Sequence, residues 1–74
     1  MNLTARSRSL SEGEIVRTLA ETNSPSDLMD YCAFVAWELR RTHDIVWRQR
    51  LRRMLRHYQR ALHLQSQGRH AQVR

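Results

Sequence analysis

Apolar positions begin to recur regularly only after residue 10. The spacing of one helix face is kept by Ile15, Val16, Leu19 and Ala20. Ahead of them, Ser11 and Glu14 fit a capping box, in which each side chain accepts a hydrogen bond from the backbone amide of the other residue. Leu10 and Ile15 have the spacing of a hydrophobic staple around the same helix start. These signals predict a short helix that ends near Thr22.

A second helix start follows at Ser24. Ser24 as the N-cap, Pro25 at the first helical position and Asp27 in the first turn all favour initiation there. The apolar stripe that follows is made of Leu28, Cys32, Val35, Ala36 and Leu39, and it is widened by Phe34 and Trp37. We therefore expect this helix to be the most buried element of the chain.

A third apolar stripe has a different phase. Its members are Trp47, Leu51, Met54, Tyr58 and Ala61. At about 100° per residue this stripe is displaced by about 100° from the preceding one, so a single straight helix would have to bury two faces. A break at residues 42–44, with Thr42 or Asp44 capping a third helix from about Ile45 to Gln65, resolves the conflict. Because no glycine or proline marks the break, one bent helix stays open as the alternative.

These elements predict a small all-α protein, in which a short N-terminal helix precedes two longer helices in an antiparallel hairpin. Residues 10–67 form the single helical domain, residues 1–9 a disordered arm and residues 68–74 a disordered tail. A chain of 74 residues buries only a small core. We therefore expect a homo-oligomer, with the hairpin completed as a dimeric bundle.

The 4, 3, 4, 3 spacing of the third stripe is typical of a helix that packs along its length. Ordinary packing within the hairpin or dimer and a seam for a separate partner both fit this spacing. The candidate partner-binding side chains are Phe34, Trp37, Trp47, Leu51, Met54 and Tyr58. Trp37 and Trp47 are the expected interface anchors, because tryptophan is enriched among the residues that dominate binding energy.

Charge is unevenly distributed along the chain. Residues 1–44 contain all seven acidic residues and five arginines, whereas residues 45–74 contain eight arginines and no acid. A basic face on the third helix comprises Arg48, Arg52, Arg53, Arg56 and Arg60, flanked by Gln49 and His63. Guanidinium groups at this spacing bind phosphate oxygens, so nucleic acid is one reading of the face. A solvated face, partly paired with acids of the first two helices, is the other.

Several kinds of chemistry have no motif in this sequence. The four histidines include no i, i+4 pair, and the chain has two glycines and therefore no glycine-rich phosphate loop. Cys32 is the single cysteine, so no disulfide forms within the chain. We expect no enzyme, cofactor or metal site. With no apolar run of membrane-spanning length and no secretory signal, we expect a cytoplasmic protein.

One short segment suggests a family. Residues 34–41 resemble the AWE-x-LRR stretch of a small transcriptional-regulator-like domain of proteobacterial proteins, some of which are linked to the transfer of integrative elements. The match consists of Ala36, Trp37, Glu38, Leu39, Arg40 and Arg41. One residue is missing before the leucine, and the aspartate-proline that usually follows the arginines is absent. The resemblance implies a bacterial regulator of transcription that contacts protein or DNA, and it assigns no site residue.

Three functional hypotheses follow, the third being a purely structural assembly subunit. In the first, the chain is a small regulatory protein that binds a protein partner, such as a transcription factor, through its apolar and aromatic surface. In the second, it binds DNA or RNA through the arginine face of the C-terminal helix. Sequence-specific DNA reading has little support, because the third helix offers few side chains suited to adenine, such as Gln49 and Gln59.

Overall fold

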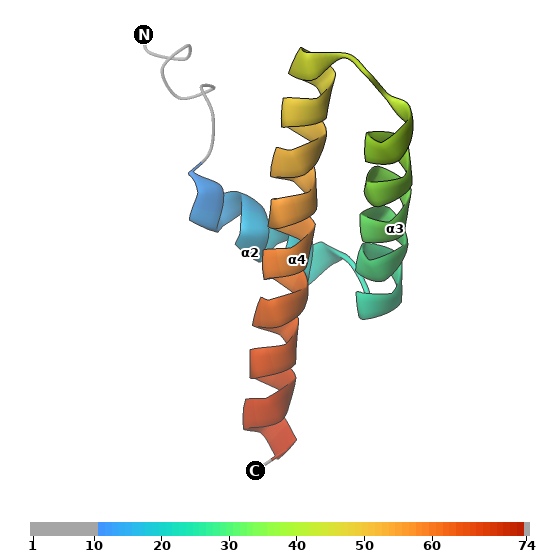
Figure 1. Cartoon of the computed structure of the whole chain (residues 1–74). Coiled ribbons are helices and arrows are strands. Elements are labelled where there is room, and N and C mark those ends of the chain that lie inside the picture. Colours follow the sequence, from blue (N-terminus) through green and yellow to red (C-terminus); the bar gives the residue numbers. More distant parts are fainter. Residues whose placement is uncertain (1–10, 74) are drawn as a thin grey trace, which may run out of the picture.

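The computed structural model describes residues 11–73, with side chains described through residue 68. Three helices make up this part of the chain: α2 (Glu12–Thr22), α3 (Pro25–Arg41) and α4 (Ile45–Val73). Figure 1 shows α3 and α4 as an antiparallel hairpin, with α2 crossing α4. The predicted all-α fold is confirmed, whereas the predicted arm at residues 1–9 lies outside the described residues.

Both predicted N-terminal helix starts are confirmed. At α2, Ser11 Oγ accepts a hydrogen bond from the Glu14 amide at 3.2 Å, and Glu14 Oε1 accepts one from the Ser11 amide at 3.1 Å. At α3, Ser24 Oγ accepts from the Asp27 amide at 3.1 Å. Because the first amides of a helix have no partner within it, these side chains fix where each helix begins. The predicted staple involves Leu10, which lies outside the described residues.

The break between α3 and α4 is made by side-chain hydrogen bonds. Asp44 Oδ1 accepts from the Trp47 amide at 3.1 Å and so caps α4, while Thr42 Oγ1 accepts from the Asp44 amide at 3.3 Å. From the first turns of α4, the Arg48 guanidinium donates to the carbonyls of Leu39 and Thr42 at the end of α3. These contacts stand in for the missing glycine or proline, and the two longer segments are separate helices.

Replacing Asp44 with alanine should lower the free energy of unfolding by about 1 kcal/mol, because the α4 amide that Asp44 caps loses its acceptor. Urea unfolding followed by circular dichroism measures this loss. Asp44→Asn is the matched control, since asparagine keeps the cap and should change stability by only a few tenths of a kcal/mol. Equal losses in both variants would show that the carboxylate charge, and not the cap, matters.

Helix α4 extends beyond its predicted end. The prediction that it stops near Gln65 was wrong, since the helix continues through Gly68 to Val73. Gly68 does not have the positive φ angle with which glycine commonly ends a helix. A glycine inside a helix costs about 1 kcal/mol relative to alanine, which weakens the helix without ending it.

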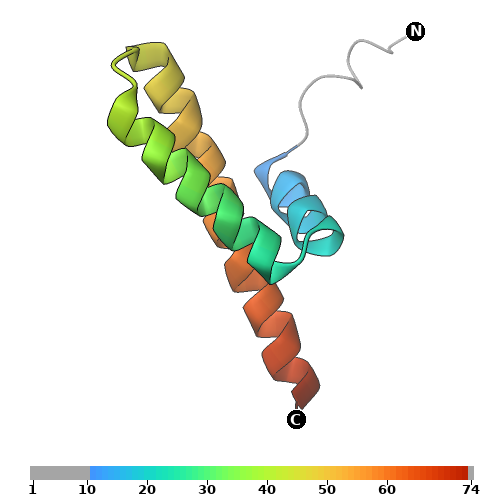
Figure 2. The same ribbon diagram turned by 90° about the vertical axis from the view of Figure 1, so that its right-hand side faces the viewer.

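Helix α4 is the central element, because it contacts both α2 and α3. Figure 2 shows α2 set to one side of the hairpin. Where the three helices meet, Val16, Leu28 and Ala61 form a buried cluster. Val35 and Leu51, from α3 and α4, are the other buried apolar residues among those described. The predicted stripes of α3 and α4 therefore face each other, which confirms the argument from their phase.

Candidate protein-binding surfaces

The face of α3 that points away from α4 carries two exposed aromatic rings. Phe34 is 60% exposed and Trp37 is 46% exposed. Their ring centroids lie 6.2 Å apart, and the guanidinium carbon of Arg41 lies 4.4 Å from the centre of the Trp37 ring. The exposed Asp30 lies one turn before Phe34. We call Asp30, Phe34, Trp37 and Arg41 the outer stripe. The helix expected to be the most buried element thus carries exposed aromatic side chains on this face.

A second apolar surface lies at the turn of the hairpin. Ile45, Val46 and Trp47 are consecutive at the start of α4 and are 70%, 60% and 40% exposed. We call these three residues the turn patch. The cap of α4 uses only the backbone amide of Trp47 and the side chain of Asp44, so the fold does not require apolar side chains at these positions.

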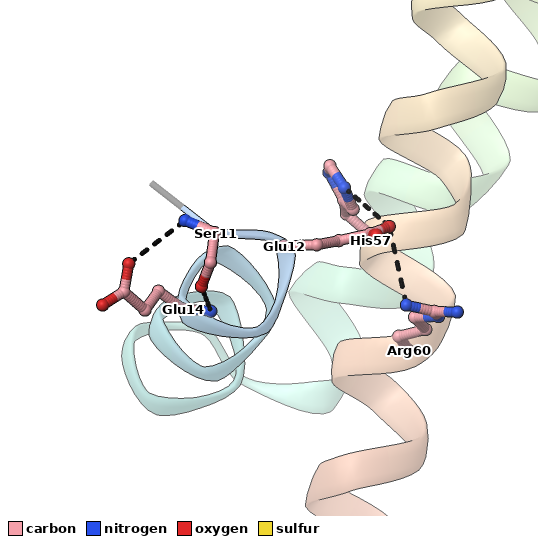
Figure 3. Close-up of polar contacts among 5 residues, drawn as sticks. All are labelled: Ser11, Glu12, Glu14, His57 and Arg60. Atoms are coloured by element: carbon pink, nitrogen blue, oxygen red, sulfur yellow. Dashed lines mark hydrogen bonds and ion pairs between the residues drawn. The ribbon is translucent and has the colours of Figure 1, made fainter. Parts of the chain in front are cut away.

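The predicted basic face is divided by the structure. Arg48 binds the end of α3, and Arg60 Nη1 lies 3.5 Å from Glu12 Oε2. The same carboxylate oxygen lies 3.3 Å from His57 Nε2. Figure 3 shows Glu12 reaching from α2 to both side chains on α4. Within residues 11–68, the exposed Arg52, Arg53 and Arg56 form no ion pair.

Three of the predicted partner-binding residues belong to the packing of the hairpin. Leu51 is 1% exposed, and Met54 and Tyr58 are half-buried. The ring of Tyr58 packs against Tyr31 of α3, with centroids 5.4 Å apart. Apart from Trp47, the third stripe therefore packs within the chain, since it faces α3. Of the predicted partner-binding side chains, Phe34, Trp37 and Trp47 are exposed.

Gln65 has a role that we did not predict. Its Nε2 donates to the carbonyls of Ala20 and Asn23 at the end of α2, at 3.0 and 2.6 Å. Its Oε1 is buried without a hydrogen-bond partner among the described residues. The available signal was phase, because Gln65 is the next position after Ala61 in the third stripe. A glutamine on the buried stripe of a helix indicates a polar partner.

The chain has a single thiol, that of Cys32. Cys32 is half-buried, and desolvation raises the pKa of its thiol, which disfavours the reactive thiolate. In the described part of the chain, no three of the His, Cys, Asp and Glu side chains are grouped so that they could hold a metal ion. Within that same part, no helix combines the length and apolar character needed to cross a bilayer.

Comparison with known proteins places the chain in no family: no family model, curated protein or solved structure matches it.

Proposed function

We propose that this chain is a small non-enzymatic regulator that acts by binding another protein through the turn patch. The observation that carries the proposal is the run of three consecutive exposed apolar side chains, Ile45, Val46 and Trp47. A run of consecutive exposed apolar side chains adds no stability to the isolated fold and favours association with another molecule. The turn holds them in place, because Asp44 and Arg48 fix the start of α4 against the end of α3.

Charge indicates the kind of partner. The exposed arginines of α4 begin just beyond the turn patch, at Arg50, Arg52 and Arg53, and no acid occurs in residues 45–74. An apolar centre with arginine at its rim is a common composition for a protein interface. The partner should therefore present an apolar surface bordered by acidic residues. A role in transcription rests on the resemblance of Ala36–Arg41 to the regulator-like domain.

Affinity capture tests this proposal. The tagged wild-type chain and the Ile45→Ser/Val46→Ser variant are compared for the proteins that they retain, and each retained protein is then titrated with both. Affinity should fall at least about tenfold in the variant, as for the loss of a binding hot spot. Leu64→Ser is the matched control, because Leu64 is an exposed apolar side chain farther along α4. A partner that binds the wild type, the double variant and Leu64→Ser with equal affinity would contradict the proposal.

The second candidate function is binding of nucleic acid by α4, and it is favoured by the exposed Arg52, Arg53 and Arg56, which have no acidic partner within residues 11–68. Titration of duplex DNA and single-stranded RNA at two salt concentrations separates it from protein binding. For duplex DNA, log affinity should fall with log salt with a slope of about −0.9 per neutralised phosphate. Arg53→Glu/Arg56→Glu should abolish such binding, whereas Arg40→Glu on α3 should preserve it. Absence of salt-sensitive binding would dismiss this candidate.

A further inference from the structure

We propose that the outer stripe of α3 is a homodimer interface, in which two copies of α3 pair in antiparallel orientation about a twofold axis. The proposal goes beyond the function above and does not depend on it, because the stripe and the turn patch are separate sets of side chains. The stripe has the spacing 4, 3, 4, which keeps its four members on one side of the helix. Leu28 and Val35 are buried on the side that faces α4.

The order of residues along the stripe is self-complementary. In a twofold antiparallel pair, residue i of one copy meets residue j of the other, and j meets i. When Phe34 lies opposite Trp37 of the second copy, Asp30 lies opposite Arg41 of the second copy. Two aromatic pairs then occupy the centre, and an acid–arginine pair closes each end. In this register, each of the four stripe residues in both copies lies opposite a complementary residue of the other copy.

Charge selects this orientation over the parallel one. In a parallel pair in register, Asp30 would face Asp30 and Arg41 would face Arg41, which places like charges together at both ends. Pairing through this stripe, in either orientation, places the α4 helices on opposite sides of the dimer, since α4 packs against α3 within each copy. The arginines of the two copies are thereby kept apart, which matters for a chain with a net charge of +6.

The small core of each copy is a physical reason for the chain to dimerise. Only Val16, Leu28, Val35, Leu51 and Ala61 are buried among the described residues, so each copy hides little apolar surface. In the single chain, the Phe34 and Trp37 rings lie beside each other with Arg41 over Trp37, and both rings are exposed. Pairing two hairpins through α3 covers these rings and yields a four-helix layer with α2 at its flanks.

Charge reversal tests the register. The mass of the full chain is measured by sedimentation equilibrium over a range of concentrations, for the wild type, Asp30→Arg and Arg41→Asp. The wild type should be a dimer, and each variant should dissociate at least about tenfold more readily, because each dimer then has two like-charge contacts. An equimolar mixture of the two variants should form a heterodimer, since both end pairs are again opposite in charge. Glu21→Arg and Arg56→Asp carry the same charge changes away from the stripe and should remain dimeric.

A further variant tests the interface without changing any charge. Phe34→Ala removes a side chain that is 60% exposed in the single chain, so the monomer should keep its helical circular dichroism while dimerisation is lost. A wild type that is monomeric at every concentration would overturn the proposal. A dimer that tolerates both charge reversals, or variants that fail to pair when mixed, would overturn it as well.

Discussion

Replacing Leu28 with alanine should lower the free energy of unfolding by about 3 kcal/mol, the largest effect expected of any single substitution proposed for this chain. Leu28 is fully buried at the meeting point of the three helices, where it packs with Val16 and Ala61. Truncation removes its apolar contacts and leaves a cavity that three separate helices would have to close. Because so small a domain has only a few kcal/mol of stability, the variant should be largely unfolded at room temperature.

Urea and thermal unfolding followed by circular dichroism measure this effect. Met29→Ala is the matched control, because Met29 is the next residue of α3 and is 59% exposed. It should change the free energy of unfolding by no more than about 0.5 kcal/mol. Similar stability in the two variants would show that Leu28 is not at the centre of the core.

Replacing Gln65 with alanine should lower the free energy of unfolding by about 2 kcal/mol. The amide of Gln65 is a polar link from α4 to the end of α2, where it donates to the carbonyls of Ala20 and Asn23. Without it these partly buried carbonyls lose their donor, and α2 loses a contact that fixes its position on α4. Because α2 supplies Val16 to the core, the loss should also loosen that cluster.

Hydrogen exchange of the α2 amides, together with urea unfolding, checks this prediction. Exchange should accelerate in α2 before it does so in α3. Gln59→Ala is the control, since Gln59 is an exposed glutamine on the same helix and should leave both measurements nearly unchanged. If α2 keeps its protection in Gln65→Ala, its other contacts with α4 are enough to hold this helix in place.

The helix starts were predictable because their causes are local. Ser11, Ser24 and Asp44 each cap a helix with a side chain that reaches only three residues along the chain. The end of α4 was not predictable from local sequence, because a helix ends where its last turns lack stabilisation. Gly68 alone destabilises a helix too little to mark its end. The antiparallel hairpin followed from phase, since the stripes of α3 and α4 could both be buried only against each other.

The candidate surfaces were only partly predictable. Phe34, Trp37 and Trp47 are three of the predicted partner-binding side chains, and the structure places all three at the surface. Leu51 was chosen by the same reasoning and lies in the core. Apolar character alone cannot separate these cases, because a stripe that packs within the hairpin and a stripe that awaits a partner have the same sequence pattern.

By itself, the sequence determined the helical class, the first two helix starts and the apolar stripes of the hairpin, because these features depend on neighbours close along the chain. It favoured a break at residues 42–44 but left one bent helix open. Only the tertiary structure decided how the arginines are used: Arg48 binds the end of α3, Arg60 lies beside Glu12 of α2, and Arg52, Arg53 and Arg56 lie at the surface. It also decided that Gln65 binds the end of α2. The physical reason is that the contacts of Arg60 and Gln65 join residues far apart in the sequence, where the packing of α2 on α4 decides which polar groups meet. Arg48 reaches the end of α3 because the chain reverses direction between the two helices.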